Sequence, residues 1–152
     1  MDLLELLQRD GEKIVTEAGE ALARSSLAHY AEAGQAIGQE RLGRLYELTV
    51  ESIADRNLVP VMDYMAAVAN DRFHAGYAIR EVQIAINVLE ESIWNDIVAN
   101  VPPDELARAL GLVATVLGAA KDALARAYVS LASRKKAPSL DLSALFEGST
   151  GG

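Results

Sequence analysis

The 152-residue sequence contains no cysteine, which excludes disulfide bonds, thiolate nucleophiles and cysteine-based metal sites. Histidine is scarce as well, since the chain has only His29 and His74. Only four prolines interrupt it, so long stretches are free to form helix. No window approaches the roughly 18 uncharged apolar residues that a membrane-spanning helix needs, so we expect no contact with a membrane.

Basic residues are outnumbered, with 14 Lys and Arg against 22 Asp and Glu, for a net charge of −8. This balance argues against a nucleic-acid partner, because phosphate binding needs a concentrated basic surface. The one dense basic run, residues 134–136, ends a predicted helix, where cations complement the helix dipole. The first residues carry acids among leucines and do not form a signal peptide, so we expect a cytoplasmic protein.

Helix dominates what is present. The chain is rich in alanine and leucine, and its apolar residues recur at steps of three and four, so we predict an all-α bundle of about five helices and no strands. The predicted helices cover residues 3–23, 39–55, 60–74, 78–100 and 103–133. Residues 25–38 are either a connection or a frayed helix. Gly11 and Gly19 weaken the first helix unless they permit a close helix crossing.

We expect one helical domain over residues 1–136, followed by a flexible C-terminal tail over residues 137–152. The composition changes after Ala137-Pro138. The tail contains one short apolar patch, made of Leu140, Leu142, Leu145 and Phe146. This patch is either a docking motif or part of a loosely packed terminus.

The last predicted helix is the longest and has two apolar faces. One is a heptad seam, formed by Leu106, Leu110, Val113, Leu117, Ala120, Leu124, Ala127 and Leu131. The other is a line of small residues, formed by Ala107, Gly111, Ala114, Gly118 and Ala125. Two such faces predict that one lies in the core and the other in a homodimer interface. We expect Leu110, Val113, Leu117, Ala120 and Leu124 at that interface. The alternative is a monomer whose small residues allow a close crossing within the chain.

The segment from Arg72 to Trp94, RFHAGYAIREVQIAINVLEESIW, is the most specific part of the sequence. Here a turn ending in Gly76-Tyr77 leads into a helix of the form E-V-Q-x-x-x-N-x-L-E-E-x-x-W. The matching positions are Arg72, Phe73, Gly76, Tyr77, Glu81, Val82, Gln83, Asn87, Leu89, Glu90, Glu91 and Trp94. This pattern resembles the N-terminal sensor domain of RsbR-type stressosome co-antagonists, the RsbRD N-terminal family.

The resemblance implies a globin-like helical module without haem that acts in bacterial stress-response signalling. It covers residues 38–134, and the first helix by position only. Two departures stand out. Ile86 occupies a position where the family pattern has an aromatic residue, and no output domain follows within these 152 residues. We therefore expect the output to come from a protein partner.

The polar residues of the fourth predicted helix allow three interpretations. Gln83, Asn87 and Glu90 share one stripe, and lysine is absent from it. They form a solvent-exposed face, a hydrogen-bond network with cations such as Arg41, Arg44 or Arg72, or the edge of a small-molecule site closed by Tyr77 and Trp94. The candidate ligand or interaction residues are Arg72, His74, Tyr77, Gln83, Asn87, Glu90 and Trp94.

Simpler structural roles are available for several of these residues. Gly76 suits a backbone conformation closed to other residues, Tyr77 packs across the corner with its hydroxyl bonded, and Arg72 caps the preceding helix. Trp94 is expected in the core. His74 is expected to cap a helix or lie at the surface rather than to bind haem.

No enzymatic constellation is complete. A di-iron bundle site needs two Glu-x-x-His pairs, and the chain offers one near match, Asp71 to His74. Glu90 and Glu91 are adjacent on a helix and point apart. We therefore expect no enzyme activity, no metal and no cofactor. The expected function is a sensory or regulatory module that acts by dimerisation and partner binding. The alternatives are a plain protein-interaction adaptor and a globin-like binder of haem or a small molecule.

Overall fold

The computed structural model describes residues 2–25 and 27–136, and these residues form six helices and no strand. The helices are α1 (Leu3–Arg24), α2 (Ala28–Ala33), α3 (Gln35–Asp55), α4 (Val59–His74), α5 (Ile79–Asn100) and α6 (Pro103–Lys136). The prediction of an all-α bundle with a long C-terminal helix is confirmed. The predicted tail and its apolar patch lie outside the described residues.

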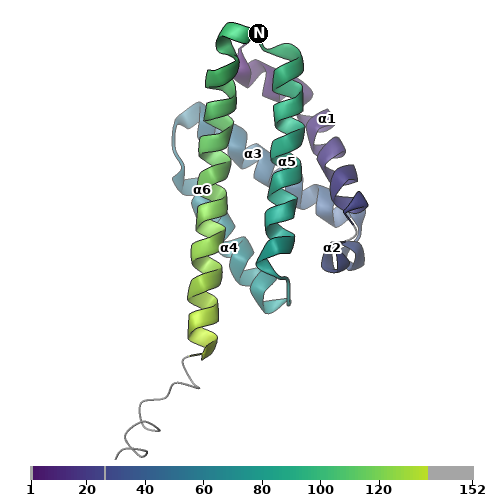
Figure 1. Ribbon diagram of the computed structural model, residues 1–152, viewed down its shortest axis with the longest axis vertical. Helices are drawn as coiled ribbons and strands as arrows, with labels where there is room; N and C mark the ends of the chain where they lie inside the picture. The colour runs from purple at the N-terminus through teal and green to yellow at the C-terminus, as the bar shows by residue number, and fades with distance from the viewer. Residues whose placement is uncertain (1, 26, 137–152) are drawn as a thin grey trace, which may run out of the picture.

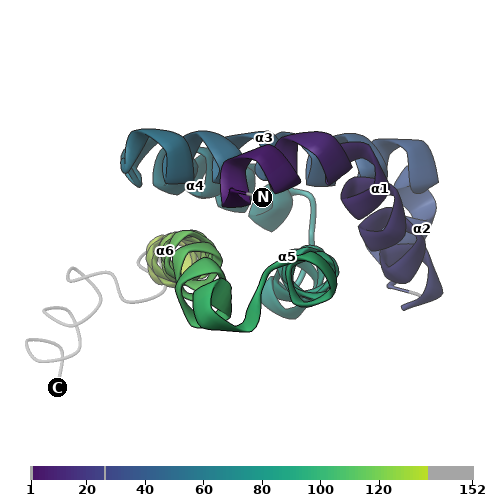
Figure 2. The ribbon, with the colours of Figure 1, turned by 90° about the horizontal axis from the view of Figure 1, so that it is seen from above.

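The helices form two layers (Figures 1 and 2). One layer is the antiparallel pair α5 and α6, and the other contains α1, α3 and α4, with α2 at its edge. Between the layers, α4 packs against α6 and α1 packs against α5, while α1 and α3 pack within their layer. The outward side of the α5–α6 pair carries no other helix in the described part of the chain.

Helix positions agree closely with the sequence pattern except near residues 25–38. There the structure has a short helix, α2, and α3 starts at Gln35 rather than Gln39. Gly34 separates the two with a φ of 93°, a conformation that glycine adopts at little cost. The pattern could not resolve α2, because a helix of six residues contains fewer than two apolar periods.

Helix α1 crosses α3 closely at Gly11. A Cβ atom built there would lie 3.0 Å from Cε1 of Tyr46 on α3. Tyr46 is buried and donates a hydrogen bond of 2.5 Å to the carbonyl oxygen of Leu7. The interpretation of Gly11 as a close-crossing residue is therefore confirmed.

The heptad seam of α6 faces the core of the chain itself. Val113, Leu117, Ala120 and Leu124 are fully buried within one chain, and Leu110 is half-buried. These four buried residues cannot line an interface with a second copy of this fold, so their assignment to a dimer interface is corrected. The small-residue line has the opposite environment, because Gly111, Ala114 and Gly118 are exposed.

The prediction that Trp94 lies in the core is wrong. Its exposed fraction is 39%, whereas the neighbouring Ile93 is fully buried. Successive helix residues point about 100° apart, so a residue next to a core position of α5 is turned away from the bundle. A lone tryptophan on an apolar helix was a weak sign of burial, because the helix carries apolar residues on both faces.

In the described part of the chain, no helix combines the length and the apolar character that crossing a membrane requires.

Candidate functional site

The turn between α4 and α5 is built around Gly76 and Tyr77. Gly76 has a φ of 89°, as its place after the helix end predicts. The backbone N–H of Tyr77 donates to the carbonyl oxygen of Arg72 at 2.9 Å, which closes the end of α4. The Tyr77 side chain is then directed back across the bundle, where it is buried.

Tyr77 contacts three further helices of the bundle. Its hydroxyl accepts a hydrogen bond from Arg41 Nη1 on α3 at 3.2 Å and donates to the carbonyl oxygen of His29 on α2 at 3.4 Å. Its ring stacks on the His29 ring with centroids 4.6 Å apart. Its carbonyl oxygen accepts from the Tyr128 hydroxyl of α6 at 3.0 Å. The prediction that Tyr77 packs across the corner with its hydroxyl bonded is confirmed.

His29 also binds the first turn of α5. Its Nδ1 lies 2.8 Å from a carboxylate oxygen of Glu81, and the same carboxylate accepts the backbone N–H of Ala78 at 2.9 Å. Burial disfavours the charged form of Glu81, but the hydrogen bonds from His29 and Ala78 outweigh it, so the pKa of Glu81 is lowered. Glu81 thus stays ionised while it caps α5 and holds α2 in place.

Arg72 is the most unusual residue of this corner. It is 7% exposed, although a charged side chain is seldom buried without partners. Its guanidinium lies over the Tyr77 ring, 5.8 Å from the centroid, and Nη1 pairs with the exposed carboxylate of Asp71. Its Nε has no hydrogen-bond partner among the described residues. None of these side-chain contacts is to a carbonyl oxygen at the end of α4, so they do not support the capping role expected for Arg72.

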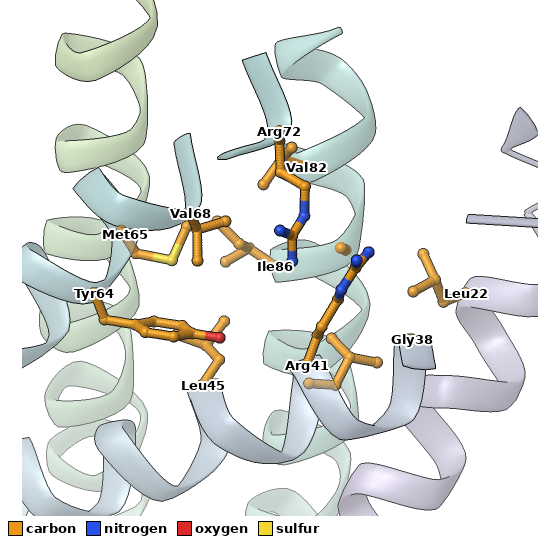
Figure 3. Close-up of a pocket in the computed structure, with 12 residues that line it drawn as sticks. Leu22, Gly38, Arg41, Leu45, Tyr64, Met65, Val68, Arg72, Val82 and Ile86 are labelled. Atoms are coloured by element: carbon orange, nitrogen blue, oxygen red, sulfur yellow. The ribbon is translucent and has the colours of Figure 1, made fainter. Parts of the chain in front are cut away.

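Arg72 lines a small cavity between α3, α4 and α5 (Figure 3). The cavity has a volume of about 30 Å³. Its lining residues are Leu22, Gly38, Arg41, Leu42, Leu45, Tyr64, Met65, Val68, Arg72, Val82, Ala85 and Ile86. Ile86 fills part of the wall, at the position where the resembled family has an aromatic residue. The guanidinium groups of Arg41 and Arg72 approach each other from opposite helices, and the Tyr64 hydroxyl points toward the space between the helices.

The polar stripe predicted on α5 is not a single network. Asn87 is exposed, Gln83 is half-buried, and Glu90 accepts a hydrogen bond of 2.8 Å from Lys121 on α6. The cation that pairs with Glu90 is thus Lys121, not one of the arginines Arg41, Arg44 or Arg72. Of the candidate residues, the structure brings together Arg72 and Tyr77, and it leaves Asn87, His74 and Trp94 at the surface.

His74 has the environment of a helix-end residue. It is exposed, and its Nδ1 lies 2.7 Å from the carbonyl oxygen of Asn70, one turn earlier in α4. It lines none of the cavities described, so its geometry fits the surface or capping role. Among the described residues, no group of three His, Asp or Glu side chains is arranged to hold a metal ion.

A second polar cluster joins α1 to α5, away from the corner. Asp96 is 5% exposed and lies 3.6 Å from Nζ of Lys13. Burial, followed by the hydrogen bond and charge of Asp10, raises the pKa of Asp96 to about 6. The hydrogen bond from Arg9 lowers the pKa of Asp10 to about 2. Between about pH 2 and pH 6, Asp96 therefore holds a proton while Asp10 is ionised.

The sequence did not predict four members of the corner: His29, Glu81, Tyr64 and Tyr128. Glu81 was noted as part of the family pattern, but its partner His29 lies 52 residues away. An acid three residues after a helix start was the available signal for its capping role. No local signal joins Tyr64 or Tyr128 to the corner, because both sit at ordinary core-facing positions of long helices.

In comparisons with known proteins, no family model, no curated protein and no solved structure matches this chain.

Proposed function

We propose that this chain is a non-enzymatic sensory or regulatory module with a globin-like arrangement of helices, similar to the N-terminal domain of RsbR-type stress-response regulators. It acts as a homodimer that binds a protein partner. The support is the Arg72–Trp94 pattern together with a bundle that leaves one side of the α5–α6 layer uncovered by any described helix. No complete catalytic constellation accompanies these features in the sequence.

One observation carries the dimer. The exposed residues of α5 and α6 include Trp94, Val98, Gly111, Ala114 and Gly118. A Cβ built at Gly111 or Gly118 would meet no neighbouring side chain or other helix within 4 Å. These glycines therefore do not serve a close crossing within the described chain, which removes the structural basis of the monomeric alternative for them.

The outer face suits a second copy of itself. It presents the large apolar side chain of Trp94 on α5 and the small residues Gly111, Ala114 and Gly118 on α6. In a twofold interface each copy supplies the same surface, so Trp94 of one copy packs on the small residues of the other. Small residues let helix backbones approach closely, which favours a helix-to-helix contact over a loose one.

Light scattering on the purified chain tests the dimer, with fluorescence of its single tryptophan as a second readout. We expect a dimer at micromolar concentration and a red shift of the emission on dilution. Ala114→Arg is expected to give a folded monomer. The matched control is Ala67→Arg, an exposed alanine of α4 in the other layer. A wild-type monomer at all concentrations, or equal loss of the dimer in both variants, would contradict the proposal.

A plain adaptor would use the same outer face for a different protein. A wild-type monomer that binds a partner through Trp94 would favour this second function. The haem alternative gains no support from His74, because that side chain is exposed and bonded to its own helix.

A further inference from the structure

The Nε–H group of Arg72 is a buried hydrogen-bond donor without an acceptor among the described residues. The side chain is more than nine-tenths buried, lines the cavity between α3, α4 and α5, and its Nε has no partner among the described residues. A buried N–H of a cation without an acceptor is costly, because its hydration is lost and not replaced. An acceptor that reaches Arg72 in the cavity would remove that cost.

A second guanidinium faces the same cavity. Arg41 comes from α3, and its hydrogen bond goes to the Tyr77 hydroxyl rather than to a carboxylate. Figure 3 shows the two guanidinium groups approaching each other, with the Tyr64 hydroxyl pointing toward the same opening from α4. Burial raises the pKa of Tyr64, and the charges of Arg72, Arg44 and Arg41 partly offset that rise, so the phenol remains a hydrogen-bond donor.

Arg72 has no buried carboxylate partner among the contacts described. The net charge is −8, yet the carboxylate that pairs with Arg72 is Asp71, whose side chain is 65% exposed. That contact reaches Arg72 from the solvent side. Two arginines and a phenol around one small cavity form the donor set that a carboxylate accepts, since guanidinium and carboxylate geometries match.

The remaining wall of the cavity is apolar, and a larger hollow adjoins it at two shared lining residues. This neighbouring hollow has a volume of about 270 Å³ and lies between α1, α2 and α3. It is lined by Gly19, Leu22, Ala23, Leu27, Ala31, Gly34 and Gly38. Leu22 and Gly38 line both spaces, and a Cβ at Gly38 would lie 3.6 Å from Leu22 Cδ2. These two residues therefore form the boundary that the cavity and the hollow share.

We propose that the cavity and the hollow together bind a small aliphatic monocarboxylate. Its carboxylate lies between Arg72, Arg41 and Tyr64, and its alkyl chain passes Gly38 into the hollow under α2. The small cavity and the larger hollow together are near the lower end of the range of about 300 to 1,000 Å³ for ligand sites, which suits a short chain. As the input signal of the module, this site rests on the proposed sensory function, although binding itself is measured without it.

Isothermal titration of the full chain with hexanoate tests the site, with acetate and hexan-1-ol as probes of the head and the tail alone. We expect one hexanoate per chain, bound more tightly than either probe. Equal affinity for hexan-1-ol would overturn the role of the arginines. Equal affinity for acetate would overturn the role of the hollow, and inorganic phosphate binding as well as hexanoate would reduce the site to a general anion site.

Two variants and one control make the test specific. Arg72→Gln removes the buried cation and is expected to weaken hexanoate binding roughly tenfold to a hundredfold, as a lost hydrogen bond to a charged group does. Arg44→Gln is the matched control, because Arg44 has the same charge, lies on α3 one turn from Arg41, and points to the exposed Glu47. Equal weakening in both variants would show a general charge effect and contradict the site.

Gly38→Ala separates binding from folding. An added methyl group meets Leu22 at an ordinary contact distance and raises helix propensity, so the variant is expected to fold and to be more stable. It also places a methyl group at the boundary where the proposed alkyl chain crosses, so hexanoate is expected to bind less tightly while acetate is unaffected. Unchanged hexanoate affinity in this variant would place the tail elsewhere. A dimer that ignores hexanoate would overturn this inference alone, whereas a monomer that binds hexanoate would overturn only the dimer.

Discussion

At the scale of single residues, the fold depends on a few polar groups that are buried with incomplete partners. Arg72 Nε and Asp96 Oδ2 both lack a hydrogen-bond partner among the described residues. Such groups normally cost stability, so each requires a compensating interaction. For Arg72 that interaction is the proposed carboxylate ligand. For Asp96 it is the proton that the folded chain holds up to about pH 6, which makes the stability of the α1–α5 contact dependent on pH.

We predict that Asp96→Asn stabilises the protein above about pH 6. The pKa of Asp96 is raised from 3.8 to about 6 in the folded chain, so the folded state holds its proton more tightly than the unfolded state. Stability from this residue is therefore greatest below pH 3.8 and is lost as pH rises to about 6. The asparagine keeps the shape and has no charge to bury.

Thermal melts from pH 4 to pH 8 provide the measurement. The wild type is expected to lose stability between about pH 4 and pH 6 relative to Asp96→Asn, and the variant is expected to melt a few degrees higher at neutral pH, where about 1 kcal/mol corresponds to roughly 2 to 4 °C. Asp10 acts in the opposite sense at lower pH, because its pKa is lowered to about 2. Parallel curves for the two proteins would show that Asp96 has no raised pKa.

At the scale of elements, the apolar period of the sequence predicted five of the helices and the presence of two apolar faces on α6. Long helices such as α5 and α6 contain several turns, so their period is clear. Two failures have physical causes. The short helix α2 has too few residues to show a period. Trp94 belongs to the apolar residues of α5 that lie outside the core, and the sequence alone did not separate these from the core residues. The period showed two apolar faces on α6, but only packing decides which one is inside.

We predict opposite effects for two glycines of α1. Gly11→Ala is expected to destabilise the protein, because the new Cβ would lie 3.0 Å from the ring of Tyr46, which is held by its bond to Leu7. Gly19→Ala is expected to stabilise it by about 1 kcal/mol, since alanine favours helix. At Gly19 the nearest side-chain atom, of Gln39, would be 3.5 Å away, an ordinary contact.

Denaturant unfolding of the two variants measures the difference, and each serves as the control for the other. Both changes add one methyl group to the same helix, so helix propensity cancels between them. An equal gain in stability for both would show that α1 can move away from α3 at Gly11 and that the crossing is not close-packed.

At the scale of the whole molecule, the corner around Tyr77 gathers residues that are distant in the chain. His29 and Glu81 are separated by 52 residues, and Tyr77 and Tyr128 by 51. Periodicity is a local signal, so it could not predict these pairs. The sequence did predict Arg72 and Tyr77 through the family-like pattern, but it could not show that Arg41 and Tyr64 meet Arg72 at a cavity. The site is therefore a product of the layer packing rather than of any one helix.

The short helix α2 lies at the edge of the bundle. α2 has only six residues, and its described anchor is His29, which stacks on Tyr77 and bonds Glu81. Short elements with few buried contacts open before the core does. We therefore expect His29→Ala to speed amide hydrogen exchange in residues 27–38 while exchange in α5 and α6 stays unchanged.

Hydrogen-exchange mass spectrometry measures this local opening, and His74→Ala is the matched control, because that histidine is exposed at the end of α4 and bonds only its own helix among the contacts described. If His29→Ala raised exchange throughout the chain, the corner would be part of the global core and α2 would not open on its own. Opening confined to α2 would expose the hollow that it covers. The proposed hexanoate would then slow exchange in residues 27–38 of the wild type. A ligand that binds only the closed state stabilises that state by RT ln(1 + L/Kd), where L is the free ligand concentration.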